Sequence, residues 1–348
     1  MSGGIAQLVA VGAQDVHLVG QPEVSFFRST YKRHTNFSQT VERQVIQGNV
    51  SNSGMSSVRF ERKGDMLNYV YFMPIKSDGT QSNIVPDWTT AVSKVELLIG
   101  GQVIDEQDST FSTQIAPTLF ATNAAKSVAG DLYGGSTNER FYPLRFAFCE
   151  NWQTALPLVA LQYHDVELRI TWGTNATEYK WEVYANYAYL DTMERESIAS
   201  QPQNMIITQV QKAINSGTKI QELNFNHPVK YLCAANTTAV NICTDTNKVK
   251  LQINGTDVAD YKFANPNFTS VPLYYHTTNG NSTPGAKLFT MPFCLDTGKT
   301  QPTGSLNFSR LDSARIICDT AVHTDDIYAV NYNVLRVENG MGGLLYSN

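Results

Sequence analysis

The sequence predicts an all-β protein that contains two copies of one sandwich or barrel fold. Two observations predict it. Apolar and polar residues alternate in short runs separated by Gly, Asn and Pro, and a period of two is typical of half-buried strands. A similar strand–turn pattern also appears in each half of the chain. The length of 348 residues is sufficient for two domains.

The strands are placed by their alternation and by the turns that follow them. Residues 95–103 contain Gly100-Gly101, and residues 249–253 precede Asn254-Gly255. Both pairs predict a hairpin with a type I′ turn, because Gly and Asn adopt positive φ angles most easily. Further strands are expected at 58–74, 166–172, 181–190, 314–318 and 327–337.

Helical patterns are few and short. Apolar residues at helical spacing cover residues 5–16. Pro22-Glu23 is typical of a helix start, and a second helix is expected from there to Tyr31. A third is expected over residues 119–128, ended by Gly130.

Three matched segments indicate an internal duplication. Residues 95–101 (VELLIGG) resemble 249–255 (VKLQING), and the apolar alternation of 166–170 returns at 314–318. Residues 185–190 (ANYAYL) resemble 330–335 (VNYNVL), which pairs Asn186 with Asn331 and Tyr187 with Tyr332. All three matches keep the same order. The junction between the copies is expected at the polar segment 200–204.

Composition and charge exclude several classes of function. Only 16% of the residues are charged and the net charge is −5, so the chain lacks the basic surplus that direct binding to nucleic acid requires. Five cysteines without C-x-x-C spacing do not indicate a disulfide framework. A secretory signal and a membrane-spanning run are not recognised, so the chain is expected to be soluble and intracellular when made.

Motifs along nearly the whole chain resemble the major capsid proteins of nucleocytoplasmic large DNA viruses, most closely those that infect algae. The most specific match is residues 155–166 (ALPLVALQYHDV). The others are residues 3–10, 12–15, 26–28, Tyr31, 35–37, 223–228, 306–312, 331–336 and 340–343. Family members often have longer loops, so this chain is expected to have small outer protrusions.

The resemblance implies two consecutive eight-stranded antiparallel jelly rolls with a few short helices in loops and at the N-terminus. We expect an N-terminal arm at 1–24, the first jelly roll at 25–199, a linker at 200–215 and the second jelly roll at 216–348. The resemblance also implies a homotrimer with a pseudo-hexagonal outline that tiles an icosahedral shell. Its expected location is the virion, after assembly in the host cytoplasm.

Neighbouring capsomers, minor capsid proteins and penton proteins are the expected partners, together with the surface of an inner membrane. The candidate contact residues lie near the N-terminus, where Ile5, Leu8 and Val9 form an apolar stripe and Arg28, Lys32 and Arg33 a basic cluster. The stripe, which continues to Val16, is short for a helix that is stable alone, so it is expected to become ordered against the base of the capsomer. A solvated helix face explains the basic cluster equally well.

Catalytic, cofactor and metal sites are not expected. His164-Asp165 lacks the G-x-S-x-G nucleophile elbow, and paired His or Cys spacing is missing. A jelly-roll lectin is the alternative function, and a glycoside hydrolase that uses two of Asp105, Glu106 and Asp108 is a third.

Overall fold

The computed structural model describes residues 3–121, 140–277 and 285–347. The chain divides into two compact units, Met1–Asn36 and Phe37–Asn348. The first unit contains helices α1 (Gly3–Val9) and α2 (Val16–Val19). Residues 22–31 form turns and extended chain rather than the second helix that we expected. Their apolar side chains are exposed, so the described residues of this unit supply no packing that would stabilise a helix there.

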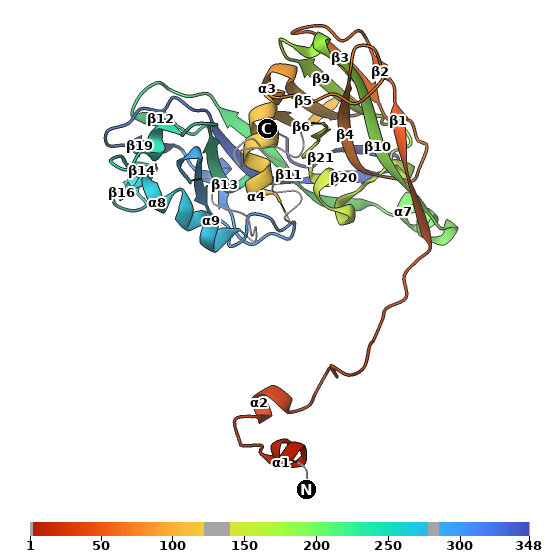
Figure 1. Ribbon diagram of the computed structural model, residues 1–348, viewed down its shortest axis with the longest axis vertical. Helices are drawn as coiled ribbons and strands as arrows, with labels where there is room; N and C mark the ends of the chain where they lie inside the picture. The colour runs from red at the N-terminus through yellow and green to blue at the C-terminus, as the bar shows by residue number, and fades with distance from the viewer. Residues whose placement is uncertain (1–2, 122–139, 278–284, 348) are drawn as a thin grey trace. The chain divides into compact units, whose positions relative to one another are not determined.

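The first jelly roll occupies the right-hand side of Figure 1 and consists of two facing sheets. Within the described part of the chain, one sheet has the order β1-β10-β4-β7, with β8 paired to β4, and the other has the order β2-β3-β9-β5-β6. The strands are β1 (Phe37–Gln44), β2 (Ile46–Gln47), β3 (Met55–Arg59), β4 (Met66–Ile75), β5 (Val92–Ile99), β6 (Gln102–Asp108), β7 (Tyr142–Pro143), β8 (Leu156–Pro157), β9 (Val166–Trp172) and β10 (Lys180–Leu190).

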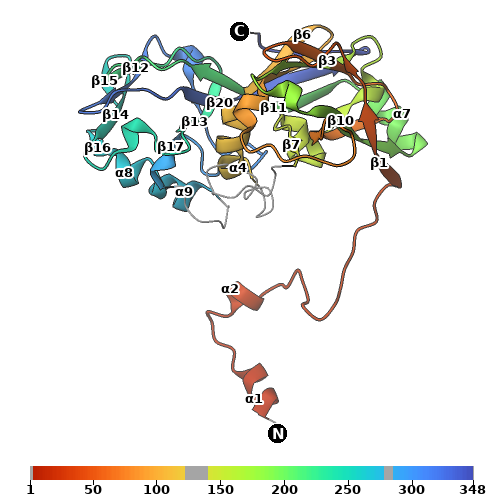
Figure 2. The same ribbon diagram turned by 45° about the horizontal axis from the view of Figure 1, so that its top comes forward.

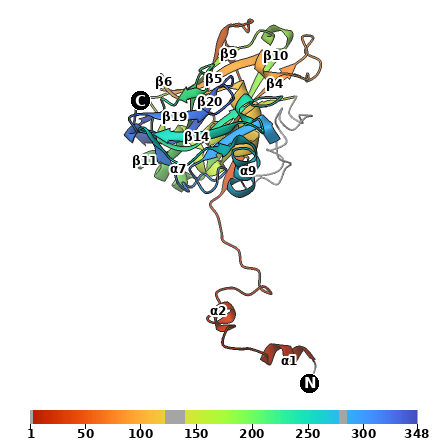
Figure 3. The ribbon, with the colours of Figure 1, turned by 90° about the vertical axis from the view of Figure 1, so that its left-hand side faces the viewer.

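The second jelly roll repeats this arrangement (Figure 1, left; Figure 3). Among the described residues, its sheets have the orders β11-β20-β13-β17, with β18 and β21 added, and β12-β19-β14-β15, with β16 added. The strands are β11 (Gln203–Ala213), β12 (Ile220–Glu222), β13 (Pro228–Ala235), β14 (Lys248–Ile253), β15 (Thr256–Asp257), β16 (Lys262–Phe263), β17 (Leu288–Pro292), β18 (Leu306–Asn307), β19 (Ala314–Cys318), β20 (Ile327–Glu338) and β21 (Met341–Leu344).

Short helices lie in the connections. They are α3 (Trp88–Ala91), η1 (Phe111–Ile115), α4 (Ala116–Leu119), α6 (Ala147–Glu150), η3 (Trp152–Thr154), η4 (Leu158–Ala160), η5 (Ala176–Glu178), α7 (Thr192–Ser200), η6 (Asn241–Cys243), α8 (Ala264–Asn267), α9 (Ser270–His276), η7 (Gly285–Lys287) and η8 (Phe308–Arg310). The helix expected over 119–128 falls mostly outside the described residues. No described helix is long and apolar enough to cross a membrane.

Both sequence-predicted hairpins are confirmed. Gly100 and Gly101 have φ angles of 58° and 81° between β5 and β6, and Asn254 and Gly255 have φ angles of 49° and 78° between β14 and β15. Positive φ at both central residues is the requirement of a type I′ turn, whose twist matches that of the strands.

The duplication is confirmed, but one of its three matches is out of register by one residue. Ala185 and Tyr187 of β10 face the first core. On β20 the residues that face the second core are Ile327 and Ala329, whereas Val330 lies on the opposite face of the sheet. Because side chains alternate between faces, the pairing of Ala185 with Val330 joins opposite faces. The other two matches keep the core face.

The segment 200–215 is not a linker over most of its length. Helix α7 ends at Ser200, and β11 then pairs with β20 from Gln203 to Ala213. The polar composition of β11 (QNMIITQVQKA) suggested a connection, but β11 is an edge strand of its sheet, where exposed polar side chains are tolerated. The second compact unit also begins at Phe37 rather than at residue 25.

Candidate assembly surfaces

The two rolls share a buried interface inside the chain. After β6, the first roll continues into η1 and α4, whose apolar side chains pack on the outer face of the sheet β11-β20-β13-β17. This cluster includes Phe111, Ile115, Leu119 and Phe120 from the first roll and Tyr231, Cys233, Tyr328 and Val330 from the second. The sheet is therefore covered on both faces, by its own core and by the first roll (Figure 2).

Polar contacts close the edge of this interface. The Asp108 carboxylate at the end of β6 accepts a hydrogen bond of 2.6 Å from the Tyr328 hydroxyl and one of 3.0 Å from Lys212 Nζ. Lys212 Nζ also lies 2.8 Å from the Asp326 carboxylate. These groups connect a strand end of the first roll with β11 and β20 of the second.

Asp105 lies in the same interface and is buried. Its carboxylate accepts hydrogen bonds of 2.9 Å from the Val210 backbone N–H and from Gln107 Nε2. Burial raises the pKa of the Asp105 carboxyl to about 7, because a low-dielectric environment disfavours the charged form. The hydrogen bond from Val210 gives a backbone N–H of the edge strand β11 its partner.

Side chains of strands β11 and β20 also pack in the core of the first roll. Ile207, Leu335 and Val337 belong to the core of the first roll, although their strands belong to a sheet of the second. His164 Nδ1 lies 2.8 Å from the Gly342 carbonyl oxygen on β21. The two rolls are therefore a single packing unit rather than two domains joined by a flexible connection.

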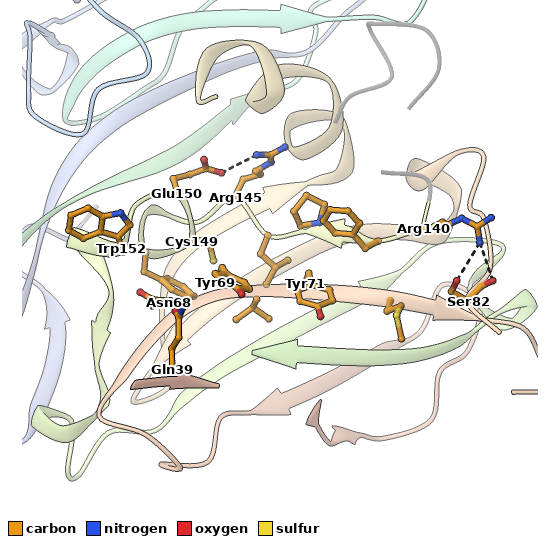
Figure 4. A pocket seen from close by; sticks show the side chains of 16 residues that line it. Gln39, Asn68, Tyr69, Tyr71, Ser82, Arg140, Arg145, Cys149, Glu150 and Trp152 are labelled. Carbon is orange, nitrogen blue, oxygen red and sulfur yellow. Dashed lines mark hydrogen bonds and ion pairs between the residues drawn. The ribbon is translucent and has the colours of Figure 1, made fainter. Parts of the chain in front are cut away.

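The equivalent sheet of the first roll has an open outer face. A hollow of about 810 Å³ lies over β4 and β7, and its wall is mainly apolar and aromatic (Figure 4). Tyr69 and Tyr71 project from β4 into it, and Trp152 stands at one end with 76% of its surface exposed. Tyr71 stacks on Tyr184 with 5.4 Å between ring centroids. Among the described residues, no segment covers these rings as η1 and α4 cover the second sheet.

The candidate residues of the N-terminal arm are all exposed within their own unit. Ile5, Leu8 and Val9 lie on α1, and no residue of that helix is buried. Arg28, Lys32 and Arg33 lie in the non-helical stretch after α2 and are also exposed. The structure therefore places the apolar stripe on a helix, but it does not bring the basic cluster onto a helix face.

The residues considered for catalysis form ion pairs and hydrogen bonds with other parts of the chain. Arg59 and Arg62 form ion pairs with Asp165, and the glycosidase candidates Asp105 and Asp108 are engaged in the interface between the rolls. In the described ranges, no group of His, Cys, Asp and Glu is arranged to hold a metal ion.

Sequence reasoning did not find the hollow, although a signal for it exists. Along β4, Leu67, Val70 and Phe72 face the core, while the alternate residues Tyr69 and Tyr71 are also large and aromatic. A strand that is apolar on both faces is typical of a sheet that is covered on both sides. The sequence therefore contains a signal for a second covering layer, but it does not show what supplies that layer.

Two solved virus capsid proteins share this architecture. The chain matches a structure described as "PBCV-1 virus capsid, quasi-atomic model" with a TM-score of 0.76 and 27% identity, over 93% of this chain and 100% of that chain. The Faustovirus major capsid protein shares the fold, with a TM-score of 0.64 and 10% identity over 94% of both chains. The architecture is that of a double jelly-roll capsid protein.

Sequence comparison identifies the family. A model described as "Major capsid protein N-terminus" matches residues 25–179, and one described as "Large eukaryotic DNA virus major capsid protein" matches residues 234–343. Major capsid proteins of Pyramimonas orientalis virus and Paramecium bursaria Chlorella virus 1 are 33% and 32% identical to this chain, with both chains covered completely. The chain belongs to the family of major capsid proteins of large eukaryotic DNA viruses.

Membership in this family assigns the protein a structural role in a virus capsid, where it associates with other capsid subunits. The lectin-like alternative rested on the jelly-roll fold alone and is not supported. The alignment with the Pyramimonas orientalis virus protein extends over 404 residues, against the 348 of this chain. The alignment therefore includes positions at which this chain has no residue.

Proposed function

We propose that three copies of the protein form a capsomer with a pseudo-hexagonal outline, and that such capsomers tile an icosahedral shell. One observation carries the proposal: a single chain contains two jelly rolls with the same strand order, packed as one unit. Three such chains present six similar bodies around a threefold axis, and a six-cornered shape tiles a hexagonal lattice. Closed rotational symmetry is the usual form of homo-oligomers.

The arm is proposed to face the interior of the shell. Ile5, Leu8 and Val9 would contact minor capsid or penton proteins, because exposed apolar stripes on a short helix indicate a protein partner. Arg28, Lys32 and Arg33 would meet acidic groups on those proteins or on the surface of an inner membrane. Assembly is proposed to take place in the host cytoplasm.

The proposal includes neither catalysis nor direct contact with the genome. The chain has 26 Lys and Arg residues against 31 Asp and Glu, which is the opposite of the excess that neutralises phosphates. The shared apolar clusters support packing between the rolls as the role of these surfaces.

Mass measurement and electron microscopy of the purified protein test the trimer. Light scattering after size exclusion is expected to give three times the chain mass of 38.6 kDa, and class averages are expected to show a threefold axis. A species of one chain mass at micromolar and higher concentrations, or averages with twofold symmetry, would contradict the proposal.

A further inference from the structure

The two rolls have corresponding strand pairs in the sheets that contain β4 and β13. Val70 pairs with Ala185, and Leu232 pairs with Ala329. A register irregularity follows directly after Val70 in the first roll, and one residue pair later, after Tyr231, in the second. A polar group is also repeated: Arg43, Glu182 and Tyr184 of the first roll correspond to Lys212, Asp326 and Tyr328 of the second. By this register Tyr69 and Tyr71 correspond to Tyr231 and Cys233.

These equivalent faces have different environments within one chain. Tyr231 and Cys233 are fully buried under η1 and α4. Tyr69 is 43% exposed, and the hollow of about 810 Å³ occupies the place over it. The helical segment that follows β6 thus covers the sheet of the second roll, while the sheet of the first roll lacks this layer among the described residues.

The second roll has the matching helix, and two of its aromatic side chains are exposed. Phe263 pairs with Lys248 on β14 as Asp108 pairs with Lys94 on β5. The segment after Phe263 is therefore equivalent to η1 and α4, and it contains α8 and α9. Leu273 anchors α9 in the interior of the chain. The neighbouring Tyr274 and Tyr275 point outward, with 79% and 72% of their surfaces exposed.

The polar edges of the two contacts also differ consistently. At the internal contact, Asp108 of the covering segment accepts hydrogen bonds from Tyr328 and Lys212. On the open face, Glu182 of the sheet itself accepts a hydrogen bond of 2.7 Å from the Tyr184 hydroxyl and pairs with Arg43. The open face of the first roll therefore needs no acidic residue from the segment that covers it. In the second roll the position equivalent to Asp108 is Phe263, which is not acidic. The open face and helix α9 are both aromatic, so their surfaces are compatible.

We propose that helix α9 of one copy docks in the hollow of the next copy, with Tyr274 and Tyr275 against Tyr69, Tyr71 and Trp152. This inference rests on the proposed trimer and assigns its subunit contact. The contact is head to tail, since each copy supplies one helix and one hollow, and such a contact must close into a ring or extend into a filament. Repetition of the internal roll-to-roll contact closes the ring of six rolls with three copies. Large aromatic residues are the usual anchors of such interfaces.

Two complementary variants test the contact. Tyr274→Glu with Tyr275→Glu removes the helix surface, and Tyr69→Glu with Trp152→Glu removes the hollow. Both pairs change exposed side chains, so the fold is expected to survive, and unchanged circular dichroism checks this. Each variant is expected to be monomeric, with association weakened about 100-fold or more. Tyr346→Glu, also at an exposed tyrosine, is the matched control and is expected to remain trimeric.

The mixture of the two variants gives the sharpest result. The Tyr274→Glu/Tyr275→Glu variant keeps an intact hollow, and the Tyr69→Glu/Trp152→Glu variant keeps an intact helix. These two surfaces can form one contact, so a 1:1 mixture is expected to give a complex of two chains and none of three. Trimers in either variant alone, or no complex in the mixture, would overturn the assigned contact. Wild-type protein that is monomeric would overturn the proposed trimer, and this inference with it.

A photo-cross-linking amino acid at position 275 gives an independent measurement if a glutamate variant fails to fold. Cross-links are expected to peptides that contain Tyr69 or Trp152 and only within trimers. Cross-links from position 275 to residues 1–36, or to α9 of another copy, would exclude the proposed occupant of the hollow.

Discussion

The hydroxyl of Tyr328 in the second roll donates a hydrogen bond of 2.6 Å to the carboxylate of Asp108 in the first. This contact ties the end of β6 to β20 and forms the polar edge of an apolar interface. Tyr184, the equivalent tyrosine of the first roll, donates instead to Glu182 of its own strand. A tyrosine at equivalent positions thus joins the two rolls through Tyr328, whereas Tyr184 bonds only within its own strand and makes no contact with the other roll in this hydrogen bond.

Removal of this hydrogen bond is expected to loosen the two rolls. Tyr328→Phe leaves the half-buried Asp108 with one partner fewer, and a hydrogen bond to a charged group contributes about 1.5–3 kcal/mol. The free energy of unfolding in urea, at fixed protein concentration, is expected to fall by about that amount. Tyr346→Phe, at an exposed position, is the control and is expected to change it by less than about 0.5 kcal/mol. Equal effects of the two changes would argue against the assigned role.

Asp105 is expected to make stability fall as pH rises from about 4 to 7. Burial raises the pKa of its carboxyl to about 7 in the folded chain, so the folded state holds a proton that the unfolded state has released. Stability is therefore full below the unfolded pKa and is lost as pH rises through 7, by at most about 1.4 kcal/mol per pH unit. Urea unfolding of the wild type and Asp105→Asn at pH 4.5, 6 and 8 measures this. A constant difference between the two proteins would contradict the prediction.

His323 is expected to have the opposite effect. It is buried, with Nε2 3.4 Å from Cys318 Sγ, and burial lowers the pKa of its imidazole to about 4. The unfolded chain binds a proton below pH 6.5 that the folded chain does not, so stability is lost as pH falls from about 6.5 towards 4. Thermal unfolding of His323→Gln is expected to show a weaker dependence on pH over this window than the wild type. An unchanged pH dependence would show that His323 is not the group that titrates.

The turn between β5 and β6 allows a matched pair of glycine substitutions. Gly100 and Gly101 both have positive φ, so alanine at either is strained by about 1–2 kcal/mol. A Cβ at Gly100 would also approach the His164 ring to 2.5 Å, whereas a Cβ at Gly101 meets nothing within 4 Å. We expect Gly100→Ala to cost about 1–3 kcal/mol more than Gly101→Ala. Urea unfolding of the two variants measures the difference, and equal costs would show that the His164 ring moves freely.

The arm is expected to act in shell assembly and not in trimer formation. Deletion of residues 1–20, or charge reversal of Arg28, Lys32 and Arg33, is expected to leave the trimeric state unchanged, since these residues lie outside the unit that contains both rolls. Closed shells are expected to be reduced in number in electron micrographs of infected cells. Normal shells, or loss of trimers, would show that the arm has another role.

Most strands were predictable because alternation and turn residues are local properties. Residues 166–172 and 314–318 alternate strictly and form β9 and β19. β11 was missed because an edge strand does not need an apolar pattern on both sides. The match of 185–190 with 330–335 was out of register because Asn and Tyr recur in both segments, whereas the direction of each side chain depends on the irregularity beside it.

The assembly surfaces were predictable only in part. The exposed apolar stripe of Ile5, Leu8 and Val9 follows from the helical period. The hollow over Tyr69 and Tyr71 does not, because an aromatic strand face has the same pattern whether its cover comes from the same chain or from another.

By itself the sequence determined the β-class, the duplication and the likeness to capsid proteins, because strand period, turn chemistry and motif order are written along the chain. Only the tertiary structure decided that η1 and α4 cover the sheet of the second roll while Tyr69 and Trp152 remain exposed. The physical reason is that burial depends on which elements meet in space. Two sheets of equivalent topology can therefore differ within one polypeptide, one with a buried and the other with an exposed outer face.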